Sequence, residues 1–279
     1  MERYLDPTND VAFKKVFGTE SNKHLLISLL NALLRLKGEN EIIDITILPQ
    51  EQSPVWREEK KIIFDVRCKD QAGNQYIVEM QNRVVPEFFK RCQFYNSHVY
   101  VSQLSKGMPY LNLTPVILLS ICNQDLFPEP EYISYHKILN VNNGKQYLKD
   151  LSFVFVELQK FNKKETELKT LEDKWLFFLK EAHDRQSIPK SLKSTPVSAA
   201  FDVLEQFNWS KEEYDLYIQN KLAVDTELGA LQEAKAEGKL EEKRAIAKNL
   251  IAQGLEIKIV SKATGLSEEQ IQAIVKGKN

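Results

Sequence analysis

The chain has 279 residues, 43% of them hydrophobic and 28% charged, and its formal net charge is −1. This composition is ordinary for a globular protein. It excludes an overall positive field that would by itself attract nucleic acid, so any anion-binding surface must be a local patch. Cys68, Cys92 and Cys122 are odd in number, far apart and free of any C-x-x-C spacing. They indicate neither a disulfide framework nor a zinc site, and they favour a reducing compartment.

Neither secretion nor membrane insertion is expected from the apolar segments of this chain. The opening MERYLDPTND lacks the apolar stretch of a signal peptide. The most apolar segment, PVILLSIC, is too short to cross a bilayer. We therefore expect a cytoplasmic protein with no membrane partner.

Two helices are predicted near the N-terminus. The segment DPTNDVAFKKVFG has Asp6 or Thr8 as a helix cap and Gly18 as its end. The next helix is predicted to begin at Ser21 and to end at Gly38. Its leucines recur at helical spacing and are expected in the core: Leu26, Leu29, Leu30, Leu33 and Leu34.

Strands and one long helix follow. A hairpin is predicted in residues 62–81, with Gly73 and Asn74 at its turn. A helix is expected from Pro86 to Gly107. Further strands are predicted at residues 42–48, 114–123, 131–141 and 153–161. Residues 1–162 are therefore predicted to form a mixed α/β domain with a central sheet.

The chain beyond Lys163 has a helical pattern. We assign residues 163–225 to a helical extension, and residues 226–279 to a charged helix and a helix-turn-helix-like unit. Capping boxes open two of these helices: Ser210 with Glu213, and Ser267 with Gln270. Residues 239–279 hold eight Lys or Arg against five acids, a modest balance of +3. DNA contact and self-association through these C-terminal helices, giving a homo-oligomer, both remain open.

Three polar groups gather on one face of the predicted hairpin. Side chains alternate between faces along a strand, so Glu79 and Gln81 share a face. Opposed residues of an antiparallel pair also point the same way. A turn centred on Ala72 sets Asp65 opposite Glu79, whereas a turn centred on Gly73 sets Asp65 opposite Gln81. Either register brings the three groups within roughly 5–8 Å of one another.

This face has the composition of a metal site. Two carboxylates this close repel, and one takes up a proton unless a cation lies between them. Mg²⁺ favours one or two carboxylates together with water and phosphate oxygens, and it activates a bound water for attack on phosphorus. Asp65 and Glu79 are therefore candidate metal ligands. The alternative is an ordinary solvated face on which Asp65 pairs with Arg67 or Lys69.

Several segments carry a family resemblance: LDPTNDVAFKKVFG, FDVRCKD with QYIVEMQ, FFKRCQFYNSHVYVSQLSKGMPY and IAKNLIAQGLEIKIVSKATGLSEEQI. On these segments the chain resembles the Rpn family of recombination-promoting nucleases, often described as transposases of the PD-(D/E)XK superfamily. The resemblance covers essentially the whole chain. It implies a restriction-endonuclease-like core within residues 1–162, with a mixed central sheet flanked by helices. It also implies Mg²⁺-dependent DNA cleavage of low sequence specificity.

The resemblance assigns roles to individual residues. Asp65 takes the place of the motif aspartate and Glu79 that of the motif glutamate, both as metal ligands. Gln81 stands where the superfamily usually has lysine, and Asp10 is the acidic residue of the first helix.

Glutamine at position 81 leaves the positive charge of the usual lysine unassigned. An amide orients water but carries no charge. Lys14, one helical turn from Asp10, is a candidate substitute, as are Lys69 and Arg67. In the next helix Arg91 and Tyr95 share one face, with Lys106 further along; these three are candidates for DNA contact or, alternatively, for helix solubility and core packing.

Three hypotheses follow from these residues. The first is a phosphodiester hydrolase, a DNA endonuclease using Mg²⁺, with Mn²⁺ or Ca²⁺ as alternatives, that aids recombination or mobile-element activity. The second is a nuclease-fold DNA-binding protein with weak catalysis. The third is an assembly module that oligomerises through its C-terminal helices.

Overall fold

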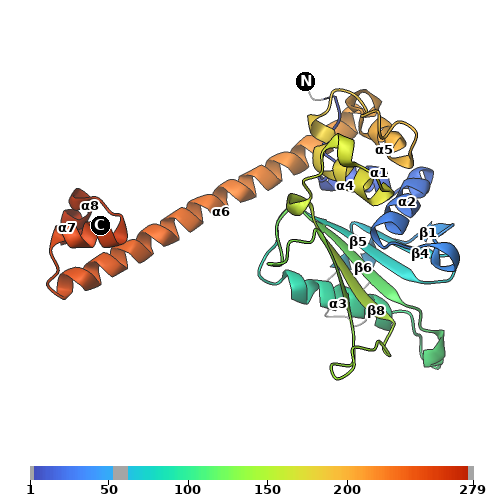
Figure 1. Cartoon of the computed structure of the whole chain (residues 1–279), viewed down its shortest axis with the longest axis horizontal. Coiled ribbons are helices and arrows are strands. Elements are labelled where there is room, and N and C mark those ends of the chain that lie inside the picture. The colour runs from blue at the N-terminus through green and yellow to red at the C-terminus, as the bar shows by residue number, and fades with distance from the viewer. Residues whose placement is uncertain (1–2, 53–61, 276–279) are drawn as a thin grey trace. The chain divides into compact units, whose positions relative to one another are not determined.

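The computed structural model describes residues 3–52 and 62–275 (Figure 1). Its contacts divide the chain into two compact units, Met1–Asn220 and Lys221–Asn279. Each unit has its own buried core, and the long helix α6 begins in the first and ends in the second. The three-part division predicted from the sequence stays a prediction.

The first unit contains a six-stranded sheet in the order β1-β4-β5-β6-β8-β7. In that order its strands are β1 (Ile45–Ile47), β4 (Val66–Asp70), β5 (Gln75–Gln81), β6 (Val116–Cys122), β8 (Leu151–Glu157) and β7 (Ile133–Lys137). Strand β6 pairs in parallel with β5 and β8, and the other neighbours are antiparallel. The mixed α/β class is therefore confirmed. A separate antiparallel pair joins β2 (Glu51–Gln52) and β3 (Ile62–Ile63).

Helices cover the two faces of this sheet unequally (Figure 1). One face carries α1 (Asp10–Phe17), α2 (Lys23–Leu33), α4 (Leu171–Glu181) and α5 (Pro196–Leu204), and the other carries α3 (Phe88–Val101). Successive side chains of β5 point to opposite faces of the sheet and so pack into two different hydrophobic cores. Val78 and Met80 join the core under the four helices, whereas Ile77 packs with Phe88 and Cys92 of α3. Glu79 therefore lies on the α3 face.

The cap of α1 differs from the predicted one. The side-chain oxygen of Asn9 accepts hydrogen bonds from the backbone N–H groups of Val11 and Ala12, so Asn9, not Asp6 or Thr8, caps the helix. The helix ends at Gly18, as predicted. Two other predicted helix ends, Gly38 and Gly107, are too late.

The early end of α2 has a local cause. Arg35 adopts a left-handed backbone with φ of 55°, which no L-residue adopts within a helix. The Asn31 amide then holds the returning chain, because it bonds both the backbone N–H and the carbonyl of Ile42. The predicted start at Ser21 is also wrong, since a 3₁₀ turn, Glu20–Asn22, precedes the helix.

The second unit is a small helical cluster. It contains the end of α6 (Lys211–Ala252), then α7 (Ile257–Thr264) and α8 (Glu268–Val275). Its buried core is short: Ala247, Val260, Leu266 and Ile271. Both predicted capping boxes form, at the starts of α6 and α8.

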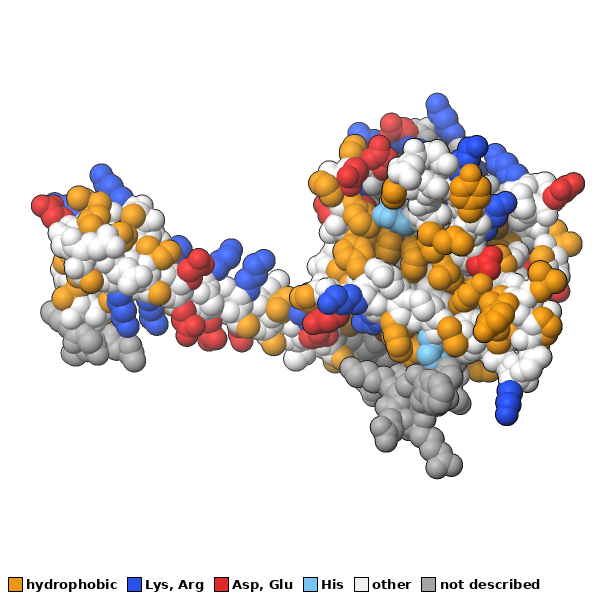
Figure 2. Space-filling view, turned by 90° about the horizontal axis from the view of Figure 1, so that it is seen from below, with side chains coloured by type: hydrophobic (Ala, Val, Ile, Leu, Met, Phe, Trp, Pro, Cys, Tyr) orange, Lys and Arg blue, Asp and Glu red, His pale blue; other side chains and the backbone are white. Residues whose placement is uncertain are grey.

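Membrane insertion finds no support in the helices. Within residues 3–52 and 62–275, none is both long and apolar enough to cross a bilayer. The 42-residue α6 exposes charges of both signs along its length (Figure 2).

Candidate active site

The register of β4 on β5 sets the geometry of the candidate site. Val66 pairs with Val78, and continuing this register by one residue sets Asp65 opposite Glu79. Of the two turn positions considered, the one centred on Ala72 is therefore observed. The backbone N–H of Asp65 donates to Oε1 of Glu79 at 3.4 Å, and Oδ2 of Asp65 accepts from the backbone N–H of Met80 at 2.9 Å. The two carboxylates thus lie together where β5 ends.

Helix α1 brings a cation and a third carboxylate to this point. Lys14 Nζ lies 3.2 Å from Oδ1 of Asp65. Burial, followed by the nearby Asp65 charge, raises the pKa of Asp10, while Lys14 and a hydrogen bond from Asn220 oppose that rise. Asp10 and Lys14 are one helical turn apart and so face the hairpin together.

Helix α3 approaches from the other side of the site. Arg91 Nη2 donates to Oε1 of Gln81 at 2.5 Å, and Nε2 of Gln81 donates to Oε2 of Glu79 at 3.4 Å. The Gln81 oxygen is therefore occupied by Arg91, and its NH₂ group faces the carboxylates. Tyr95 lies one turn beyond Arg91, and burial, with Glu79 as the next cause, raises its pKa.

Glu79 is buried, with 7% of its surface exposed. Burial and then the Asp65 charge raise the pKa of Glu79 to about 8, against the lowering effects of the Asp65 N–H, Arg91 and Lys14. The alternative of a solvated face is therefore wrong for Glu79. Among the described residues Asp65 forms its ion pair with Lys14, and no ion pair of Asp65 with Arg67 or Lys69 is present.

The donors at this site fit a hard divalent cation. A neighbouring carboxylate disfavours the charged form of a buried carboxyl group. A bound cation relieves this repulsion, as a bound proton does. Two carboxylates suit Mg²⁺, which completes its shell with water and phosphate. In the described part of the chain, no group of three or more His, Cys, Asp or Glu is arranged to hold a metal. A metal here would therefore take few protein ligands.

Lys106 and Lys69 are not brought to these carboxylates. Lys106 is exposed beyond the end of α3. Gln103, three residues earlier, bonds Thr114, whose hydroxyl donates to the carbonyl of Gly73 at the hairpin turn. Lys69 is exposed near that same turn. A DNA contact by Lys106 stays a prediction.

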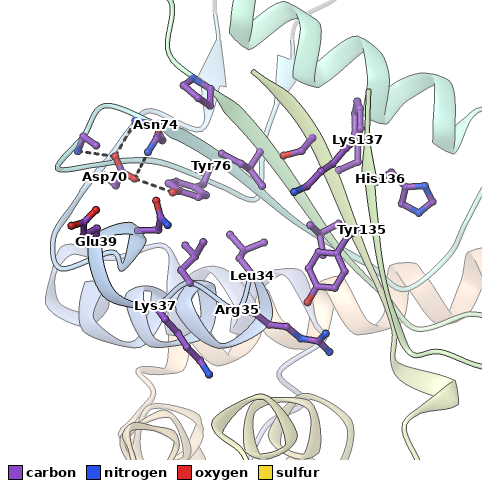
Figure 3. A pocket seen from close by; sticks show the side chains of 18 of the residues that line it. Leu34, Arg35, Lys37, Glu39, Asp70, Asn74, Tyr76, Tyr135, His136 and Lys137 are labelled. Carbon is purple, nitrogen blue, oxygen red and sulfur yellow. Dashed lines mark hydrogen bonds between the residues drawn. The ribbon is translucent and has the colours of Figure 1, made fainter. Parts of the chain in front are cut away.

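The other acid of the hairpin, Asp70, has a structural role. Its carboxylate accepts hydrogen bonds from the backbone N–H groups of Ala72 and Asn74, the Asn74 amide and the Tyr76 hydroxyl. Figure 3 shows this group at the edge of a cavity of about 530 Å³ between the sheet and the segment that follows α2, residues 34–40. The cavity lies at the starts of β5, β6 and β8, and neither Asp65 nor Glu79 lines it. It is therefore distinct from the carboxylate site.

One contributor to the site, Asn220 of α6, could not be predicted from the sequence. Its side chain bonds Asp10, although the two are separated by most of the first unit. Asn220 belongs to no recognisable motif, and its role follows only from the packing of α6 beside α1. The neighbouring Tyr217 bonds the same N-terminal segment, through its hydroxyl to the backbone N–H of Asp6.

Two family comparisons agree with this geometry. Residues 7–234 match the PD-(D/E)XK nuclease family transposase. The chain belongs to this family. Residues 240–276 match the C-terminal HTH domain of the Rpn/YhgA-like nuclease family. The predicted resemblance is thus confirmed, and so is the fold, a PD-(D/E)XK core followed by an HTH domain. No curated protein and no solved structure matched the chain.

Proposed function

We propose that this nuclease-family chain is a Mg²⁺-dependent DNA endonuclease of low sequence specificity that promotes recombination or mobile-element activity. The observation that carries the proposal is the pair formed by the partly exposed Asp65 and the buried Glu79. The backbone N–H of Asp65 donates to the Glu79 carboxylate at 3.4 Å, and Lys14 Nζ lies 3.2 Å from the Asp65 carboxylate. Two opposed carboxylates that can hold a metal ion, with a lysine beside them, are suited to hydrolysis of a phosphodiester. Mn²⁺ or Ca²⁺ are alternative occupants.

Each side chain has a distinct proposed role. Asp65 and Glu79 would hold the cation, with Asp10 close by. When bound, the cation supplies a water of lowered pKa and stabilises negative charge on the phosphate. Gln81 presents an NH₂ group, because Arg91 occupies its oxygen, so it can position water or phosphate but cannot accept a proton. Lys14 supplies the positive charge that the superfamily usually takes from lysine at position 81.

Plasmid nicking tests this proposal directly. Wild-type protein is expected to nick supercoiled DNA with Mg²⁺ and not with EDTA. Asp65→Ala is expected to lower the rate by about 1,000-fold or more, because the charge stabilisation at the phosphate is lost. Asp44→Ala is the matched control: Asp44 is exposed and pairs with Lys23, away from the site. Equal rates for Asp65→Ala and wild type would refute the proposal.

The glutamine at position 81 favours a second function, DNA binding with weak catalysis. Band-shift titration of the same proteins separates the two. Loss of nicking in Asp65→Ala with DNA affinity unchanged supports the endonuclease. DNA binding by a wild type that never nicks supports the second function. Arg91, Tyr95 and Lys106 remain proposed DNA contacts in either case.

The C-terminal HTH domain is proposed to contact DNA or to join copies of the chain. Removal of the residues after Gly238 tests the second role by size-exclusion chromatography with light scattering. We expect a smaller assembly if the tail joins copies. An unchanged number of copies would exclude the tail from assembly and leave DNA contact as its role.

A further inference from the structure

Arg67 carries a positive charge that nothing in the described part of the chain neutralises. Its Nη2 donates to the neutral side chain of Gln75 at 2.8 Å. Its Nε is buried and has no hydrogen-bond partner. Its guanidinium lies 5.9 Å from the centre of the Phe64 ring, and no carboxylate of the described residues forms an ion pair with it. A half-buried charge without a counter-ion is energetically costly, and residues 3–52 and 62–275 supply no anion for Arg67.

The other cations around the site are engaged differently. Lys14 pairs with Asp65, and Arg91 bonds Gln81. Arg67 alone of these three keeps a buried donor without an acceptor. An arginine fork matches phosphate oxygens in two parallel hydrogen bonds, which a lysine does not.

The position of Arg67 connects it to the candidate active site. Arg67 is two residues beyond Asp65 on the same arm of the hairpin, about 7 Å along an extended chain. Its ring neighbour Phe64 packs edge-on against Tyr95 of α3, with ring centres 5.4 Å apart. Tyr95 in turn is close enough to Glu79 for that carboxylate to act on it. Phe64 and Tyr95 therefore lie between Arg67 and the region of Glu79 on the α3 face.

We propose that Arg67 binds a backbone phosphate of the DNA substrate, on the α3 side of the phosphodiester held at Asp65 and Glu79. This inference rests on the proposed function, because it takes the substrate to be DNA. Phosphate contacts set the register of a nucleic acid without reading its sequence. Arg67 is thus a binding and positioning residue, consistent with cleavage of low sequence specificity.

DNA affinity is the first test. Fluorescence anisotropy of a labelled duplex is measured in Ca²⁺ for the full-length wild type, Arg67→Gln, Arg67→Lys and a control, Lys37→Gln. Lys37 is exposed at the far end of the sheet beside the cavity in Figure 3. We expect Arg67→Gln to weaken DNA binding about tenfold. The slope of log affinity against log salt concentration should fall by about one, with Arg67→Lys between the variant and wild type. The control is expected to stay within about twofold of wild type.

Thermal unfolding without DNA separates binding from structure. If Arg67 serves a phosphate, Arg67→Gln leaves the melting temperature unchanged or raises it, because an unpaired buried charge is removed. DNA should then raise the melting temperature of wild type more than that of the variant. A lower melting temperature with wild-type DNA affinity would overturn the proposal and make Arg67 structural. Unchanged affinity with an unchanged melting temperature would overturn it as well.

The two proposals fail in different ways. Normal nicking by wild type together with unaltered binding by Arg67→Gln removes only the role of Arg67. If wild type never nicks but Arg67→Gln still loses affinity, the endonuclease proposal fails and the phosphate contact stands.

Discussion

Glu79→Gln is expected to abolish DNA nicking and, at the same time, to stabilise the metal-free protein at pH 8. Glu79 is buried next to Asp65, and these two causes raise the pKa of Glu79 to about 8. At that pH the wild type bears the cost of a charge near another charge in a poorly solvated place. Glutamine keeps the shape and the acceptor for the Asp65 N–H but removes the charge. The Glu79→Gln protein would therefore lose a metal ligand and gain stability of the folded state.

The pH dependence of this effect has a definite sign. A carboxyl whose pKa is higher in the folded chain than in the unfolded chain binds its proton more tightly when folded. Its contribution to the free energy of unfolding is complete below the ordinary value of 4.5 and is lost as the pH rises toward 8. Each tenfold difference in proton affinity is worth about 1.4 kcal/mol, so we expect a loss of about 2–4 kcal/mol between about pH 5 and pH 8.

Urea unfolding in EDTA at several pH values measures this loss. We expect the wild type to weaken with rising pH and Glu79→Gln to show a flatter profile. Glu39→Gln is a control, because Glu39 is exposed at the far end of the sheet. Mg²⁺ at pH 8 should stabilise the wild type and not Glu79→Gln, since a cation favours the ionised carboxylates. Parallel pH profiles for the two proteins would contradict the burial argument.

Lys14→Gln is expected to lower the rate of a single nicking turnover by about 100-fold while leaving DNA affinity nearly unchanged. Lys14 is 3.2 Å from Asp65, and it opposes the raised pKa of both Asp10 and Glu79. Its loss removes positive charge where the phosphate gains negative charge, a change of the size seen when a preorganised donor is deleted. Lys14→Arg keeps the charge and is expected to recover part of the rate.

The adjacent Lys15 provides a matched control for this prediction. Lys15 lies on the same helix but pairs with Glu213 at 2.5 Å and contacts the Trp209 ring. Lys15→Gln removes the same charge without touching the carboxylates. We expect its nicking rate to stay within about twofold of wild type and its stability to fall by about 1 kcal/mol or less. Equal losses of rate in the two variants would show that net charge, and not the position of Lys14, matters.

The alternation of side chains between the two faces of a strand was sufficient to predict that Asp65, Glu79 and Gln81 lie on one face of the hairpin. Strand geometry is local, so it can be read from a few consecutive residues. The sequence could not choose between the two registers, because both Ala72 and Gly73 suit a turn centre. The structure has the register centred on Ala72, in which Asp65 lies opposite Glu79. The end of α2 was predicted too late because the left-handed backbone of Arg35 stops the helix, and the apolar spacing of the segment gives no sign of it.

The sequence by itself determined the mixed α/β core, the common face of Asp65, Glu79 and Gln81 in the hairpin and the capped helices at the C-terminus. Each of these depends on periodicity and capping within short segments. Only the tertiary structure decided which charges surround the carboxylates. Lys14 reaches Asp65 from α1, and Arg91 reaches Gln81 from α3, while Arg67 has no counter-ion within the described residues. Such neighbours come from distant segments brought together by packing on the sheet, and burial, which sets the pKa of Glu79, exists only once that packing is complete.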